Sequence, residues 1–273
     1  MKLATLRLPG RTTAARVDGE YAVEIGAPDV GALLAEPGWH ERAAAADGPR
    51  HPLAGADLAP VVPHPGKIIC VGLNYRTHIL EMGRELPAYP TLFAKFADAL
   101  IGPYDDIVLP AVSEAMDWEA ELAVVIGTEV RHASPEQAQA AIAGYSVLND
   151  VTARDYQYRT LQWLQGKTFE STTPFGPYLV TPDELDGALT MRCEIDGEVV
   201  QQADTADLVF SPAELIVYLS QILTLRPGDV IATGTPGGVG HARKPPRYLA
   251  DGDKIVTRIA GLGELVNVAR RDG

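Results

Sequence analysis

The sequence has few positive charges, almost no cysteine and no long apolar run. Among its 273 residues, 23 Lys and Arg stand against 36 Asp and Glu, which gives a formal net charge of −13. Proteins that bind nucleic acid or anionic membranes do so through basic surfaces, so this balance excludes both as partners. A small anionic ligand is not excluded, because it responds to the local charge of its site.

The two cysteines, Cys70 and Cys193, are too few for a disulfide framework and favour a reducing compartment. The longest apolar stretches, residues 68–73 and 122–127, are far shorter than the roughly 20 residues that cross a bilayer. Residues 1–9 lack the apolar core of a secretory signal. We therefore expect a soluble, cytoplasmic protein.

A composition change divides the chain near residue 63. The first sixty residues are rich in Ala, Gly and Pro, with short alternating runs typical of strands. Pro60, Pro63 and Pro65 then remove three amide hydrogens and stiffen the backbone, which is typical of a connector. We expect a small N-terminal α+β domain over residues 1–63 and a larger domain over residues 64–273.

Strand signals outnumber helix signals along the chain. Asp18-Gly19 and Asp196-Gly197 each lie between β-type runs, which is typical of a hairpin turn. Two Ser-Pro pairs followed by Gln or Glu predict capped helices over residues 135–143 and 212–223. We predict a β-rich α+β fold with a mixed or mainly antiparallel sheet.

Three carboxylates form the first candidate site. Glu119 and Glu121 are two apart in a predicted strand over residues 119–126, so they share one face of it. Burying the pair without a partner would cost several kcal/mol each, and Mg²⁺ prefers such oxygen ligands. Asp150, at the end of an apolar strand, is a third ligand candidate. The alternatives are a solvated strand face for the glutamates and a helix cap or turn for Asp150.

His78 and Glu81 form a second candidate. They lie three residues apart in a segment with helical spacing, so their side chains can meet. The carboxylate could orient the imidazole and raise its basicity for water activation. The alternative is a solvated, inert surface pair.

Lys167 and a glycine-rich loop complete the residues that could carry chemistry. Lys167, between a glycine and an aromatic residue, could pair with a substrate carboxylate or with a structural acid. The loop over residues 233–240 matches neither a P-loop nor a dinucleotide fingerprint. Its backbone N–H groups could hold an anion, but a tight turn explains the glycines equally well.

Taken together, these segments resemble the fumarylacetoacetate hydrolase family. Each segment alone is a weak match, but seven in the right order are specific for the family. The resemblance runs from about residue 66 to the C-terminus, through residues 69–78, 99–103, 119–127, 149–155, 166–169, 175–177 and 233–236.

The resemblance implies a rolled mixed β-sheet core with peripheral helices, a small N-terminal domain and a homodimer. It implies that Glu119, Glu121 and Asp150 bind Mg²⁺, or Mn²⁺ or Ca²⁺ as in some relatives. His78 and Glu81 match the family's water-activating dyad, which is carried on a flexible lid.

The remaining matched positions concern the substrate. Lys167 matches the lysine near the keto-acid end, and Arg154 and Gln157 match positions that help to form the pocket. Thr235 lies in the loop that closes one side of it. Residues 170–173, Glu-Ser-Thr-Thr, depart from the Asp-Thr or Asp-Gly of many relatives, which leaves the substrate open.

The activity that fits the residues and the resemblance is metal-assisted hydrolysis of a carbon–carbon bond in an acylpyruvate, such as fumarylpyruvate, in aromatic-compound breakdown. The alternative is a decarboxylase or isomerase of the same family, acting on oxaloacetate or 2-hydroxyhepta-2,4-diene-1,7-dioate. In either case the partner is a small anionic keto acid. A non-catalytic binding protein is the third hypothesis, and the full set of site residues argues against it.

Overall fold

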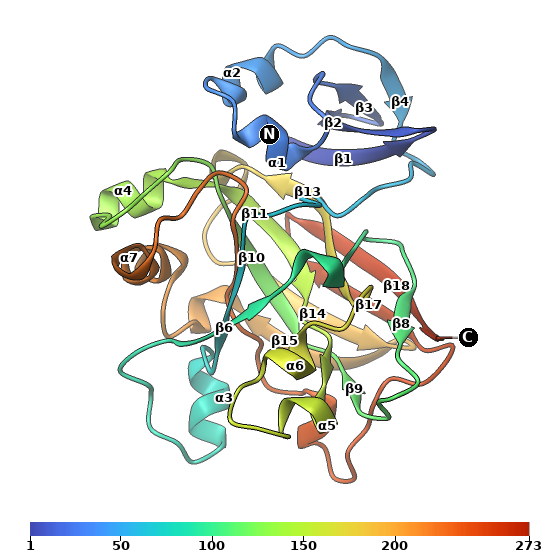
Figure 1. Ribbon diagram of the computed structural model, residues 1–273, viewed down its shortest axis with the longest axis vertical. Helices are drawn as coiled ribbons and strands as arrows, with labels where there is room; N and C mark the ends of the chain where they lie inside the picture. Colours follow the sequence, from blue (N-terminus) through green and yellow to red (C-terminus); the bar gives the residue numbers. More distant parts are fainter. Residues whose placement is uncertain (273) are drawn as a thin grey trace.

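The computed structural model describes residues 1–272 and has the predicted β-rich α+β fold (Figure 1). Two sheets contain nearly all of its strands, and helices lie around them. The large sheet has the strand order β4-β3-β2-β1-β13-β11-β10-β16-β5-β6, with β7 paired to β13 beside this path. The second sheet has the order β15-β14-β17-β18-β8, and β12 pairs with β9 in a separate ribbon.

The strands of the large sheet are β1 (Lys2–Leu8), β2 (Arg11–Asp18), β3 (Tyr21–Glu24), β4 (Arg50–Pro52), β5 (Ile68–Gly72), β6 (Thr91–Lys95), β7 (Leu100–Ile101), β10 (Ala120–Ile126), β11 (Ile142–Asn149), β13 (Thr173–Val180) and β16 (Val230–Ala232). The others are β8 (Ile107–Leu109), β9 (Met116–Asp117), β12 (Thr152–Ala153), β14 (Thr190–Ile195), β15 (Glu198–Asp204), β17 (Lys254–Ile259) and β18 (Gly263–Arg271). Parallel pairing occurs in β5–β16, β7–β13 and β8–β18, so the expected mixed sheet is confirmed.

The helices are short, and the two expected from capping patterns are present. Ser134 and Ser211 each form a complete capping box, and the helices end three residues and one residue earlier than predicted. The α-helices are α1 (Val30–Leu34), α2 (Trp39–Ala44), α3 (Arg76–Glu81), α4 (Pro135–Ala140), α5 (Arg154–Gln157), α6 (Leu164–Lys167) and α7 (Pro212–Ile222). Single 3₁₀ turns are η1 (Ala97–Ala99), η2 (Pro182–Glu184), η3 (Thr205–Asp207) and η4 (Gly240–Ala242).

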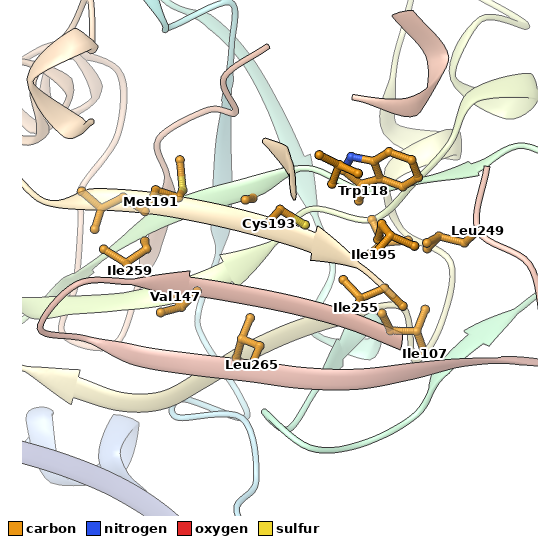
Figure 2. Packing of buried hydrophobic residues seen from close by; sticks show 14 of the residues in the cluster. Ile107, Trp118, Val147, Met191, Cys193, Ile195, Leu249, Ile255, Ile259 and Leu265 are labelled. Atoms are coloured by element: carbon orange, nitrogen blue, oxygen red, sulfur yellow. The ribbon is translucent and has the colours of Figure 1, made fainter. Parts of the chain in front are cut away.

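The largest apolar cluster lies where the second sheet packs against the large one. Figure 2 shows Met191, Cys193 and Ile195 of β14 pointing into it, with Leu265 of β18 and Val147 of β11 close by. This alternation of buried side chains along β14 is the period-2 pattern of a strand with one covered face. The packing fixes β10 and β11, which carry the candidate site.

The first strands continue the large sheet rather than forming a separate one. β1 pairs with β2 on one side and with β13 on the other (Figure 1). The domain boundary near residue 63 and the homodimer stay predictions. Within residues 1–272, no helix combines the length and apolarity needed to cross a membrane.

Candidate metal centre and active-site cavity

Antiparallel pairing brings the three predicted carboxylates together. Ala120 of β10 pairs with Asn149 of β11, so the start of one strand lies beside the end of the other. Oxygen atoms of Glu119, Glu121 and Asp150 consequently lie within 4.8 Å of one another, and all three residues are buried.

Strand β10 begins one residue later than predicted, at Ala120, so it contains Glu121 and Glu119 directly precedes it. Glu119 is held instead by bonds outside the ladder. Its N–H donates to the Asn149 side chain at 2.9 Å, and its carbonyl accepts from the N–H of Asp150 at 2.8 Å. Glu119 and Glu121 nevertheless point toward the same site, as their spacing predicts.

Two buried lysines surround the carboxylates. Lys167, at the end of α6, places Nζ 2.6 Å from a Glu119 oxygen and 2.7 Å from an Asp150 oxygen. Lys95, the last residue of β6, places Nζ 2.6 Å from the other Asp150 oxygen. Lys95 is not among the residues predicted for the site, although a lysine that ends a strand among apolar and aromatic residues is a signal in the sequence.

Arg154 and Gln157 lie one turn apart on α5 and contact each other. Arg154 is 2.6 Å from Glu119 in an ion pair, and it donates to the Gln157 side-chain oxygen at 2.9 Å. Both residues are nearly fully buried. The structure therefore brings the two predicted pocket residues to the carboxylate cluster.

Asp117 is a second residue that the sequence analysis missed. Its carboxylate accepts from Arg154 Nε at 2.8 Å and from the backbone N–H groups of Trp118, Gly240 and His241 at 2.9, 2.7 and 2.9 Å. The sequence signal is an acid two residues before Glu119 in an otherwise apolar run. Asp117 thus holds Arg154 and the loop around Gly240 in one place.

Glu121 and Asp150 have pKa values shifted in opposite directions. Burial raises the pKa of Glu121 well above its ordinary value, and the charges of Asp150 and Glu119 raise it further. Burial also acts to raise the pKa of Asp150, but the charges of Lys167 and Lys95 outweigh it and bring the value down to about 2. The surroundings of Glu121 therefore disfavour its ionised form, whereas those of Asp150 favour it.

The donor set fits a hard divalent cation. Three buried carboxylates crowd together, and a bound cation would favour the ionised form of Glu121 against the burial and the neighbouring negative charges that raise its pKa. Oxygen-only ligation suits Mg²⁺, Mn²⁺ or Ca²⁺ rather than a thiolate-seeking metal. Glu121 is already oriented, because one of its oxygens accepts from the N–H of Gly234 at 2.8 Å.

A cavity of about 280 Å³ opens beside this cluster. Of the residues predicted for the site, seven line it: His78, Glu119, Glu121, Arg154, Gln157, Lys167 and Thr235. Asp150 is fully buried and contacts the lining through Lys167. The hydroxyl of Thr235 accepts from Gln201 at 2.8 Å, and Gln201 also binds the N–H of Ala120, which ties this wall to β10.

His78 and Glu81 lie on α3, as their spacing predicts, but only His78 lines this cavity. Glu81 lines a neighbouring pocket that His78 shares. A Cβ built at Gly237 would lie 3.0 Å from His78 Nδ1 and 3.6 Å from a Glu81 oxygen, so both polar ends lie against the same glycine. Within residues 1–272, the two side chains make no hydrogen bond to each other.

The imidazole of His78 favours its neutral form. Burial lowers its pKa below the ordinary value of 6.5, although the charges of Glu81 and Glu119 act in the opposite direction. A neutral imidazole can accept a proton at neutral pH. His78 is therefore suited to act as a base in the cavity.

Comparison with known proteins shows the family of this chain. The family model described as "Fumarylacetoacetate (FAA) hydrolase C-terminal" matches residues 67–270. The chain belongs to the fumarylacetoacetate hydrolase family. This confirms the resemblance found in the sequence and makes the chain a member of an enzyme family.

Three members illustrate the range of activities in the family. A mitochondrial oxaloacetate tautomerase of Rattus norvegicus is 44% identical over 229 residues, which cover 83% of this chain and 73% of that protein. The structure of a fumarylacetoacetate hydrolase from Exiguobacterium antarcticum is 34% identical with a TM-score of 0.89, and each chain is covered completely. A 5-carboxymethyl-2-hydroxymuconate delta-isomerase from Mycobacterium smegmatis is 33% identical with a TM-score of 0.84, again over both complete chains.

By name, these relatives are a tautomerase, a hydrolase and an isomerase. The rat relative is named as a mitochondrial protein. The cytoplasmic location expected from the sequence stays a prediction for this chain.

Proposed function

We propose that this chain is a divalent-metal-dependent enzyme that interconverts the keto and enol forms of a small 2-oxo acid, with oxaloacetate as the first candidate. The observation that carries the proposal is one cavity lined by two of three clustered carboxylates, by Lys167 and by the neutral base His78. The 44% identity to an oxaloacetate tautomerase supports this reaction over hydrolysis, which the sequence analysis put first.

Lys167 is the residue suited to the oxygen end of the substrate. An ammonium group has three N–H donors, and Glu119 and Asp150 use two of them. Within residues 1–272 the third has no hydrogen-bond acceptor, and it would bind the 2-oxo oxygen or the adjacent carboxylate of a ligand in the cavity. Burial acts to lower the pKa of Lys167, but the charges of Asp150 and Glu119 outweigh it and raise the pKa, so the group stays charged.

Glu119, Glu121 and Asp150 would hold Mg²⁺ or Mn²⁺, which when bound supplies a Lewis acid for the 2-oxo oxygen and a template for the acid. Arg154 orients Glu119 for this role through their 2.6 Å ion pair. Preorganised charge of this kind is commonly worth about 3 kcal/mol per donor in the transition state.

His78 would move the proton. Its neutral nitrogen takes a proton from C3 of the keto acid, the C–H electron pair becomes the C2–C3 double bond, and the 2-oxo oxygen gains the negative charge. Return of the proton from the imidazolium to that oxygen gives the enol and restores neutral His78. General base catalysis of this type contributes roughly 10²–10⁴-fold.

The experiment is an ultraviolet assay of keto–enol interconversion with oxaloacetate, 2-hydroxyhepta-2,4-diene-1,7-dioate, acetylpyruvate and fumarylpyruvate. Purified protein is assayed with Mg²⁺, with Mn²⁺ and after EDTA treatment. The proposal expects metal-dependent acceleration of oxaloacetate interconversion above the buffer rate. Equal rates with and without protein on oxaloacetate would overturn it.

Acylpyruvate hydrolysis is the second candidate, because the base that accepts a C3 proton could equally deprotonate a water molecule in the cavity. The identity to the hydrolase from Exiguobacterium antarcticum supports it. The same panel separates the two. Hydrolysis would give pyruvate from acetylpyruvate or fumarylpyruvate, whereas interconversion leaves the carbon skeleton whole.

A further inference from the structure

Arg84 is a cation in the cavity lining with no partner of its own. It follows α3 and lines the same cavity as His78, Glu119 and Lys167. Within residues 1–272, its guanidinium makes no ion pair and no hydrogen bond, whereas Arg154 and Lys167 are each held by carboxylates. The side chain of Arg84 is exposed to solvent and free to meet a ligand.

Arg84 also lies near the proposed base. Its positive charge acts to lower the pKa of His78, which places the guanidinium within electrostatic reach of that imidazole. The two acids nearest in sequence do not neutralise it inside the cavity, because Glu81 lines the neighbouring pocket and Glu85 lines neither. Arg84 therefore adds a positive charge to the lining of the cavity.

The charges around the cavity match a dianion. Asp117, Glu119, Glu121 and Asp150 face three buried cations, Lys95, Lys167 and Arg154, which leaves a formal charge of −1 when all are ionised. A divalent cation on the carboxylates changes the formal charge of the cluster to +1. Including Arg84 brings the formal charge around the cavity to +2, with the histidines counted as neutral. One substrate carboxylate would neutralise the charge of the buried cluster. Arg84 would then be available to bind a second carboxylate of the same substrate.

We infer that Arg84 binds the second carboxylate of a dicarboxylic 2-oxo acid and so selects dicarboxylic over monocarboxylic substrates. The inference rests on the proposed function, since it assumes that the first carboxylate and the 2-oxo group lie at the metal centre. A guanidinium binds a carboxylate through two parallel N–H bonds, which gives direction as well as charge. The remaining lining is largely apolar, with Val71, Leu73 and Phe93 among its residues, and suits the carbon chain between the two ends.

The test compares ligands that differ only in the second carboxylate. Oxaloacetate is paired with 2-oxobutanoate, and 2-oxoglutarate with 2-oxopentanoate, so each pair has equal chain length. Dissociation constants are measured by calorimetry on the complete protein in Mg²⁺. We expect the dicarboxylic member of at least one pair to bind about tenfold more tightly or better, as for a charge-assisted hydrogen bond.

Three variants test whether Arg84 causes the preference for dicarboxylic ligands. Arg84→Gln should remove it by weakening only the dicarboxylic ligand, and Arg84→Lys should restore part of it. Arg76→Gln is the matched control, because Arg76 is an exposed arginine of α3 that does not line the cavity and changes the net charge equally. The control should bind every ligand as the unmodified protein does.

The outcomes separate this inference from the proposed function. A preference that survives Arg84→Gln, or equal binding of both members of each pair to the unmodified protein, overturns the role of Arg84. If no 2-oxo acid binds in the presence of Mg²⁺, the proposed function itself fails. A preference lost equally in Arg76→Gln would attribute the effect to overall charge and would also overturn the assignment.

Discussion

Asp117 and Arg154 form a buried ion pair, with Oδ2 of the acid 2.8 Å from Nε of the arginine. Neither residue is a proposed metal ligand. Arg154 also forms an ion pair with Glu119, and the Asp117 carboxylate also accepts hydrogen bonds from the backbone N–H groups of Gly240 and His241. One buried pair therefore connects the carboxylate cluster to a wall of the cavity.

Replacing Asp117 with Asn should destabilise the protein and disturb the site together. The NH₂ group of the asparagine would face N–H donors that bind a carboxylate oxygen in the unmodified protein. The substitution also breaks the buried ion pair with Arg154, which costs about 3–5 kcal/mol. Urea unfolding should show this loss, and calorimetry should show weaker Mg²⁺ binding in the folded variant. The control is Asp57→Asn, which removes an exposed ion pair to Arg7 and should cost about 1 kcal/mol or less. Equal effects of the two substitutions would contradict the prediction.

Glu121→Gln should abolish stabilisation by metal without weakening the metal-free protein. The neutral amide removes a buried charge that the neighbouring carboxylates Asp150 and Glu119 oppose. The unmodified protein should gain about 2.7 kcal/mol of unfolding free energy at a Mg²⁺ concentration 100 times the dissociation constant.

Thermal unfolding in EDTA and in Mg²⁺ checks this prediction for both proteins. In EDTA the variant should melt at or above the temperature of the unmodified protein, and Mg²⁺ should not shift it. A Mg²⁺ shift that persists in the variant would show that Glu121 is not a ligand.

The parts of this site that follow from local patterns could be predicted from the sequence. The i, i+2 spacing of Glu119 and Glu121 requires only a strand, and the position of Asp150 requires only that an apolar strand end there. The Ser-Pro capping patterns likewise located α4 and α7 from residues three apart. For the two capping boxes the deciding contacts are short-range in sequence. Glu119 lies just outside the strand, and Asn149, 30 residues away, helps to hold it in the orientation that the spacing predicts.

The rest depends on contacts between distant segments. Lys95 meets Asp150 from 55 residues away, and Asp117 meets Gly240 from 123 residues away, so no local pattern distinguishes them from surface charges. The orientation of Glu81 was also beyond prediction. Helical spacing places it near His78, but only His78 lines the cavity, and both side chains lie against Gly237, more than 150 residues further along the chain.

Lys95→Met should destabilise the protein more in EDTA than in Mg²⁺. Lys95 and Asp150 are both fully buried, and removing the lysine leaves the carboxylate with Lys167 alone, at a cost of about 3–5 kcal/mol. A divalent cation at the carboxylates would supply part of the missing charge. Denaturant unfolding in both buffers measures the difference, with Arg258→Met as the control for a half-exposed ion pair. Equal losses in the two buffers would count against a cation beside Asp150.

The pH dependence of turnover should report the lowered pKa of His78. Burial favours the neutral imidazole, so the active form of the base persists below the ordinary pKa of 6.5. We expect kcat/KM for oxaloacetate to be level around pH 7 and to fall only as the pH drops through an apparent pKa below 6.5. His78→Gln should lower kcat by about 10²–10⁴-fold and remove this acidic limb, with Mg²⁺ binding unchanged because His78 is not a proposed ligand. The control is His132→Gln, since His132 lies outside the cavity and should retain the original profile. An acidic limb that persists unchanged in His78→Gln would assign the proton transfer to another group.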